Sequence, residues 1–115
     1  MNNSSKFTRW DIWIARVQFE DSAESKIRPV LIIDGTLCYV FALKITSHVP
    51  RDDRPGEYQI VQWREAGLLK LSILRISKRL NLPSESFVKM IGELTELDRM
   101  NVSRMYGELY LDKSF

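Results

Sequence analysis

Short runs of β-branched and aromatic residues, separated by turn residues, are the feature of this sequence that most constrains its fold. The clearest run is Pro29–Ile33. The proline pushes Arg28 into extended geometry, and the Asp34-Gly35 pair after the run is typical of a tight turn. The sequence therefore predicts a hairpin between this run and the apolar run Leu37–Ile45.

The same pattern predicts further strands on both sides of this hairpin. Polar segments at 20–26 and 46–56 interrupt it, and the second contains two prolines that exclude regular pairing. The additional predicted elements are strands at Trp10–Phe19, Glu57–Val61 and Ser72–Ile76, one helical turn closed by glycine at Gln62–Gly67, and a turn at Leu82–Glu85. The segment Phe87–Leu94 fits either a strand or a helix. Gly92 is a mild argument against a long helix there.

The C-terminal part of the sequence predicts one α-helix from Glu96 to about Tyr110. Thr95 can cap its N-terminus, with Asp98 in the capping-box position. Apolar residues are spaced for one face of this helix at Leu97, Met100, Val102, Met105 and Leu109. Five or more short strands followed by one helix predict a mainly β fold with a C-terminal α-helix. The expected form is a small, partly open barrel with the helix packed against it.

Length and composition indicate a single globular domain over residues 1–115. A chain of 115 residues can bury a substantial core, and 44% hydrophobic with 28% charged residues is the composition of an ordinary globular protein. No apolar run approaches the ~20 residues of a membrane span. The N-terminus also lacks the apolar region of a signal peptide, so we expect a cytoplasmic protein.

The residue inventory restricts the chemistry. Cys38 and His48 are the single cysteine and the single histidine, so we expect no disulfide within the chain, no metal and no other cofactor. The sequence has no zinc-protease, nucleophile-elbow or phosphate-loop motif. The side-chain groups that remain as candidates for chemistry are arginine guanidiniums and hydroxyls. These can act on an RNA phosphodiester, because the substrate's 2′-OH is the nucleophile and the protein need only align it and stabilise charge on phosphorus.

Basic residues concentrate in the first part of the chain. Residues 1–80 hold 13 of the 17 Lys/Arg and 9 of the 15 Asp/Glu, a balance of +4, whereas residues 81–115 hold 4 and 6, a balance of −2. This asymmetry points to a polyanionic partner, with a merely solvated surface as the alternative. Arg51 and Arg54 would attract an RNA backbone, or else pair with Asp52 and Asp53 between them.

Several short motifs follow one another in a distinctive order. They are Arg9-Trp10-Asp11, Ser22 in a polar loop, Arg28-Pro29 before an apolar run, Ile45-Thr46-Ser47 at a strand end, and Arg75-Ile76-Ser77. This order resembles the MazF/PemK family of toxins from bacterial toxin-antitoxin pairs, over almost the whole chain. The resemblance implies an SH3-like barrel with a C-terminal helix, a homodimer, and cleavage of single-stranded RNA without metal.

The resemblance also implies roles for individual residues. Arg28 would be catalytic by stabilising the phosphorane and taking part in proton transfer, and Thr46 by binding the scissile phosphate. From the sequence alone, Arg28 could instead be a solvated residue before a strand, and Thr46 could close a turn. The predicted substrate-binding residues are Ser22, Lys26, Ser47, His48, Arg51 and Arg54. His48 could stack on a base, act as an acid or base, or be an ordinary surface residue.

The sequence departs from the family pattern at two places. Trp10 stands where the family has a glycine, and Asp21-Ser22-Ala23 replaces Gly-Ser-Glu. The predicted function is a dimeric toxin that cuts single-stranded RNA and whose basic groove accepts an acidic antitoxin. The alternative is a non-catalytic binding module on the same barrel, or a toxin that acts on a protein such as DNA gyrase, as the related CcdB group suggests.

Overall fold

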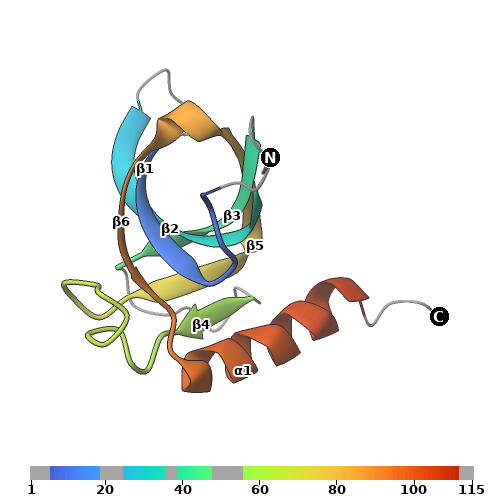
Figure 1. The fold of residues 1–115 in the computed structure, drawn as a ribbon. Coiled ribbons are helices and arrows are strands. Elements are labelled where there is room, and N and C mark those ends of the chain that lie inside the picture. Colours follow the sequence, from blue (N-terminus) through green and yellow to red (C-terminus); the bar gives the residue numbers. More distant parts are fainter. Residues whose placement is uncertain (1–5, 19–24, 36–38, 48–55, 112–115) are drawn as a thin grey trace.

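The computed structural model describes residues 6–18, 25–35, 39–47 and 56–111 (Figure 1). Within these ranges the strands are β1 (Asp11–Gln18), β2 (Ser25–Gly35), β3 (Tyr39–Thr46), β4 (Glu57–Gln59), β5 (Ile73–Pro83) and β6 (Phe87–Glu93). The helical elements are the 3₁₀ turn η1 (Ser84–Ser86), the helix α1 (Glu96–Tyr106) and the π-helical turn η2 (Gly107–Leu111). The mainly β fold with a C-terminal helix is confirmed.

The described strands form one antiparallel sheet that curls into a partly open barrel. Its strand order is β4-β5-β3-β2-β1-β6. Figure 1 shows these strands following a ring, in which η1 joins β5 to β6, while α1 lies outside the ring beside β4. A register irregularity between Leu43 and Lys44 divides the pairing of β3 with β5. Such irregularities bend and twist strands, which allows the sheet to curl.

Some strands extend beyond their predicted bounds. Asp34 and Gly35 belong to β2, where Gly35 is in register with Val40, so they are not a two-residue turn. A register shift between Ile32 and Asp34 accommodates them. Ser25 and Lys26, predicted in a loop, also belong to β2. The ambiguous segment at Phe87 is the strand β6, because it pairs with β1.

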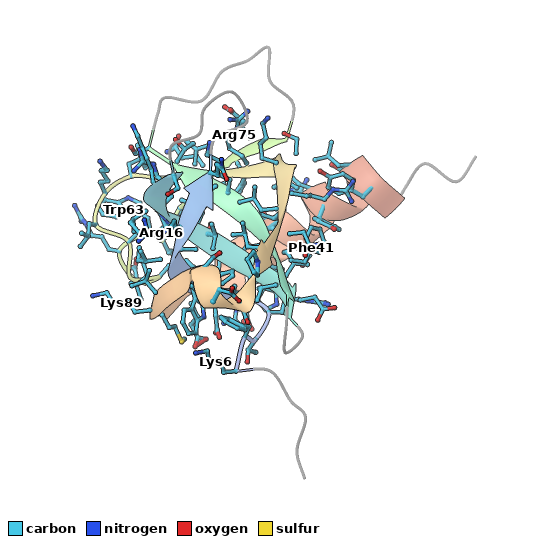
Figure 2. All side chains as sticks on the ribbon, turned by 90° about the horizontal axis from the view of Figure 1, so that it is seen from above. Lys6, Arg16, Phe41, Trp63, Arg75 and Lys89 are labelled. Carbon is cyan, nitrogen blue, oxygen red and sulfur yellow. The ribbon has the colours of Figure 1, made fainter. Side chains whose placement is uncertain are left out.

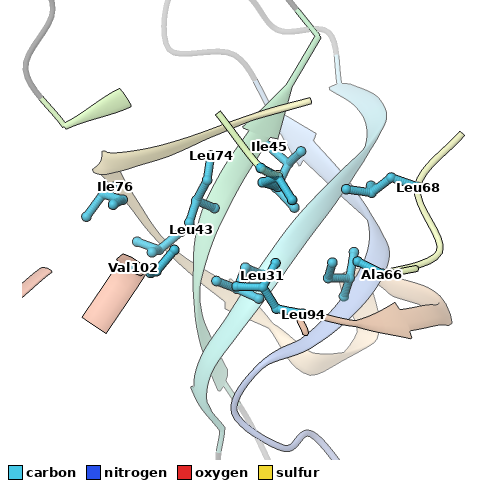
Figure 3. Packing of buried hydrophobic residues seen from close by; sticks show 11 residues of the cluster. Leu31, Leu43, Ile45, Ala66, Leu68, Leu74, Ile76, Leu94 and Val102 are labelled. Atoms are coloured by element: carbon cyan, nitrogen blue, oxygen red, sulfur yellow. The ribbon is translucent and has the colours of Figure 1, made fainter. Parts of the chain in front are cut away.

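Apolar residues are buried on both faces of the strands. On one face of β1, Trp13, Ala15 and Val17 pack with residues of β2 and β3, and the aromatic rings of Phe7 and Trp13 lie 4.8 Å apart. The other face is covered by α1 and residues 60–68. Figure 3 shows this second cluster, whose labelled residues are Leu31, Leu43, Ile45, Ala66, Leu68, Leu74, Ile76, Leu94 and Val102. Burial on both faces explains why the apolar runs show little alternation.

The predicted turn closed by glycine is confirmed at residues 61–67. Leu68 N donates to Trp63 O at 3.0 Å and Gly67 N to Arg64 O at 3.1 Å, the two bonds of a Schellman motif, and Gly67 has φ +93°. A Cβ on Gly67 would lie 2.2 Å from Ile91 O, and one on Gly92 would lie 2.0 Å from Ala66 O. The two backbones therefore contact each other directly.

The helix α1 begins where predicted but is anchored differently. Thr95 makes no side-chain cap bond, and its hydroxyl instead donates to Gln62 Oε1. Asp98 is fully buried and accepts hydrogen bonds from the backbone N–H groups of Val61 and Gln62, each at 2.9 Å, and from the Tyr58 hydroxyl. The capping box is therefore wrong, because this carboxylate binds the neighbouring segment rather than its own helix.

The predicted apolar face of α1 is only partly correct. Val102 is buried and Met105 and Leu109 pack beside it, whereas Leu97 and Met100 are exposed. The helix passes into η2 at Gly107 and so continues in a wider form to Leu111.

Candidate functional site

One pocket lies where β1, β2, β3 and β6 meet the segment that follows Gly67. It has a volume of about 520 Å³. Its lining consists of Ile14, Ile27, Arg28, Pro29, Ile45, Thr46, Ser47, Gly67, Leu68, Leu69, Lys70, Ser72, Lys89 and Ile91. Figure 2 shows Lys89 on the side of the barrel away from α1. We call this hollow the basic pocket.

Strand pairing brings Arg28 and Thr46 to the same part of this pocket. Val30 and Lys44 are the last registered pair of β2 and β3 at this end, and Arg28 and Thr46 lie two residues beyond them on their respective strands. Alternation places both on the same face of the sheet. The Arg28 guanidinium donates one hydrogen bond from Nη1 to Ile27 O at 3.0 Å, which leaves most of its donors available. The half-buried Thr46 is followed by an exposed Ser47.

Among the described residues, the charge of the pocket lining is positive. Arg28, Lys70 and Lys89 are the ionisable residues of this described lining, and it contains no carboxylate. Lys70 and Lys89 are exposed and form no ion pair within the described part of the chain. A concave site lined by one sign of charge attracts oppositely charged ligands, so the pocket is suited to an anion.

Part of the pocket lining is apolar. Ile45 is fully buried and Leu68 is 6% exposed, and Ile14 and Ile91 are further apolar residues of the lining. Apolar walls lower the local dielectric constant and so strengthen the interaction between the cations and a bound anion. The pocket can therefore bind a ligand that carries both phosphate and an apolar surface.

The pocket brings together three of the predicted site residues: Arg28, Thr46 and Ser47. Lys26 is an exposed residue of β2, in register with Val17, and does not line the pocket. The other predicted residues, Ser22, His48, Arg51 and Arg54, lie outside the described residues. The roles of all these residues remain predictions.

Lys70 and Lys89 are pocket residues that the sequence did not identify. Lys89 could have been found if the segment at Phe87 had been recognised as a strand, because alternation along a strand places such a side chain on a definite face. Lys70 follows the turn closed by Gly67, and its position depends on the contact of that turn with β6. No local pattern signals such a contact.

The motif Arg75-Ile76-Ser77 lies elsewhere in the structure. The side chain of Arg75 is 14% exposed, and its Nε lies 3.5 Å from Oε2 of Glu57. The Glu57 side chain is 2% exposed. Arg75 is in register with Glu57 on β4 and with Lys44 on β3. This arginine therefore forms an ion pair between strands and does not line the basic pocket.

The described ranges contain neither a metal-binding cluster nor a membrane-spanning helix. They contain no group of three or more His, Cys, Asp or Glu side chains arranged to hold a metal ion. Among the same residues, no helix has the length and apolarity needed to cross a membrane.

The fold and the pocket define a small β-barrel protein with one C-terminal helix and a pocket lined by cations at the barrel wall. The chain belongs to the family of PemK-like, MazF-like toxins of type II toxin-antitoxin systems, whose model matches residues 8–108. No curated protein sequence matches the chain.

Several solved structures from mycobacteria share this fold. The Mycobacterium tuberculosis toxin MazF-mt6 is 23% identical, with a TM-score of 0.68 over 87% of this chain and 95% of that one. A mycobacterial endoribonuclease in complex with its cognate antitoxin is 13% identical, with a TM-score of 0.69 over 93% of this chain and 96% of that one. At these identities the likeness shows the fold alone.

Trp10, which stands where the family usually has a glycine, has an unusual backbone conformation. Trp10 has φ +81° and is the one non-glycine residue with positive φ among the described residues. Its N–H donates to Ile32 O at 2.9 Å, and its carbonyl accepts from Leu94 N at 2.9 Å. These bonds hold the glycine-like conformation although a tryptophan occupies the position, and such a conformation is strained for an L side chain.

Proposed function

We propose that this toxin is a metal-independent endoribonuclease that cuts single-stranded RNA. The observation that carries the proposal is the basic pocket, in which Arg28 and Thr46 occur together with further cations and, as far as the described ranges extend, without a carboxylate. Membership of the MazF-like toxin family supports it. Two similar structures are named endoribonucleases, which supports the same activity.

The proposed reaction uses the nucleophile that the substrate supplies. The 2′-oxygen attacks the adjacent phosphorus, the bond from phosphorus to the 5′-oxygen breaks, and a 2′,3′-cyclic phosphate and a 5′-hydroxyl result. One proton leaves the 2′-OH and one joins the 5′-oxygen. Arg28 would hold two phosphate oxygens with its planar guanidinium, and Thr46 would donate a hydrogen bond to the same phosphate.

The proposed partners are an acidic antitoxin and a second copy of the chain. One similar structure is named as an endoribonuclease in complex with its cognate antitoxin, which supports an antitoxin as a partner. A basic pocket would attract an acidic segment for the same electrostatic reason that it would attract RNA.

Digestion of single-stranded RNA in the presence of EDTA tests the proposed activity. We expect fragments with 5′-hydroxyl ends, and no cleavage of the same sequence made with 2′-O-methyl nucleotides. Intact RNA alongside a folded protein that binds a partner tightly would favour a non-catalytic module instead. An assay of DNA gyrase supercoiling with the same protein tests the protein-target alternative.

A further inference from the structure

The basic pocket has cations on two sides of a central strand. Ile14 of β1 is in register with Pro29 of β2 and with Lys89 of β6. Arg28 and Lys89 thus belong to strands on opposite sides of β1. Two strand spacings of about 4.8 Å separate those strands by about 10 Å.

Lys70 lies in the pocket lining between two fixed points of the chain. It follows Gly67, whose backbone lies directly against Ile91 and Gly92 of β6. The hydroxyl of Ser72, a residue that is 4% exposed, donates to Lys70 O at 2.8 Å and fixes the chain at this lysine. Lys70 and Lys89 are therefore two further cations of the pocket lining whose backbone positions are defined.

The pocket that these cations line suits one nucleotide. Its lining also contains apolar residues, including Ile14 and Leu68. The volume of about 520 Å³ lies within the range of sites that hold one small ligand. Single-stranded RNA places a sugar and a base between successive phosphates, and an apolar lining accommodates the face of either.

We propose that Lys89 and Lys70 bind the phosphate next to the one that is cut, so that the pocket holds one nucleotide between two phosphates. This inference rests on the proposed function, in that the ligand is single-stranded RNA. Lysine is suited to this role because a flexible point charge contributes affinity without demanding a fixed geometry. Arg28 would act on the reacting phosphate.

The test measures binding of RNA that cannot be cut. The probe is single-stranded RNA of randomised sequence with 2′-O-methyl groups at every position, and the variants are Lys89→Met and Lys70→Met. Each should weaken binding about tenfold at 0.1 M salt, as expected for one charge-assisted phosphate contact. Each should also reduce the slope of log affinity against log salt by about 0.7.

Lys6→Met is the matched control. Lys6 is exposed, lies over the rings of Phe7 and Trp13 at 5.6 Å, and does not line the pocket. Its loss should leave binding within about twofold of wild type. Lys89 and Lys70 variants that behave like this control would overturn the inference, as would a wild-type protein that does not bind the probe.

Cleavage of ordinary RNA separates the two proposals. If the lysine variants lose affinity for the probe while wild-type protein cuts no RNA, the second phosphate site stands and the endoribonuclease proposal fails. If wild-type protein cuts RNA and both lysine variants bind and cut equally well, the activity stands and the second site is overturned.

Discussion

Arg28 and Thr46 lie on neighbouring antiparallel strands, each two residues past the registered pair of Val30 and Lys44. Because pairing alternates the two faces of a sheet, both residues belong to the same face, at the same end of the strands. Two residues 18 positions apart in the sequence therefore meet at one pocket. The first two predictions follow from this arrangement.

Arg28→Lys should reduce RNA cleavage by on the order of 10²–10³-fold, although the charge is retained. Lysine cannot hold two phosphate oxygens at a fixed separation, so the loss should concern the transition state more than RNA binding. Single-turnover cleavage, RNA affinity and thermal unfolding should be measured on both proteins. A rate within a few fold of wild type at equal stability would show that Arg28 is only a structural residue of β2.

Thr46→Ala should slow cleavage by roughly 10–100-fold, which corresponds to the loss of one charge-assisted hydrogen bond of about 1.5–3 kcal/mol. Thr46→Ser retains the hydroxyl and should recover most of the rate. Both variants should unfold at nearly the same temperature as wild type. Equal single-turnover rates for the alanine and serine variants would show that the Thr46 hydroxyl takes no part in the reaction.

Trp10→Gly should yield a more stable protein than Trp10→Ala, by about 1 kcal/mol. Both changes remove the same packing, but glycine adopts φ +81° without strain and alanine does not. Urea unfolding measures the difference. At the exposed β1 residue Arg16 the order should invert, since an ordinary strand position favours alanine over glycine. The same order at both positions would contradict this interpretation.

Tyr58 should make stability depend on pH in the alkaline range. Burial, together with the hydrogen bond to Asp98, raises the pKa of Tyr58 from 10.0 to about 12. A raised pKa means that the stabilisation is fully present below pH 10 and is lost as pH rises from about 10 to about 12. The free energy of unfolding of wild type should therefore fall faster over this range than that of Tyr58→Phe. A constant difference between them would refute the linkage.

A homodimer is the expected state in solution, on the basis of the family resemblance and the proposed function. Light scattering at micromolar concentration should give twice the mass of the 13.5 kDa chain. Dilution should reveal dissociation if the interface is weak. A monomeric mass at all of these concentrations would contradict the expectation.

Local patterns were sufficient for much of the fold. Trp10–Phe19 predicted β1 to within a residue at each end, because its composition leaves little choice other than a strand. The polar residues Ser77, Lys78 and Arg79 concealed the length of β5, which continues to Pro83 because β3 pairs with β5 on both sides of the register irregularity. Pairing with a distant strand, rather than propensity, determines such a segment.

Only the site residues that belong to short sequence motifs could be predicted. Arg28 and Thr46 were found from the family resemblance, and their common location follows from the pairing of β2 and β3. Lys70 and Lys89 were not found, because one depends on a contact between distant backbones and the other on a segment whose helix or strand character was open. Asp98 was misassigned for a similar reason, since its partners lie more than 30 residues away.

The contact between Gly67 and Gly92 also determines how the protein can respond to a ligand. Neither position can take a methyl group without colliding with backbone of the other segment. The segment that leads to Lys70 and the strand that carries Lys89 are therefore joined at van der Waals distance by their backbones. When a flexible strand of nucleic acid enters, the loss of conformational entropy falls mainly on that strand, since this part of the protein is already ordered.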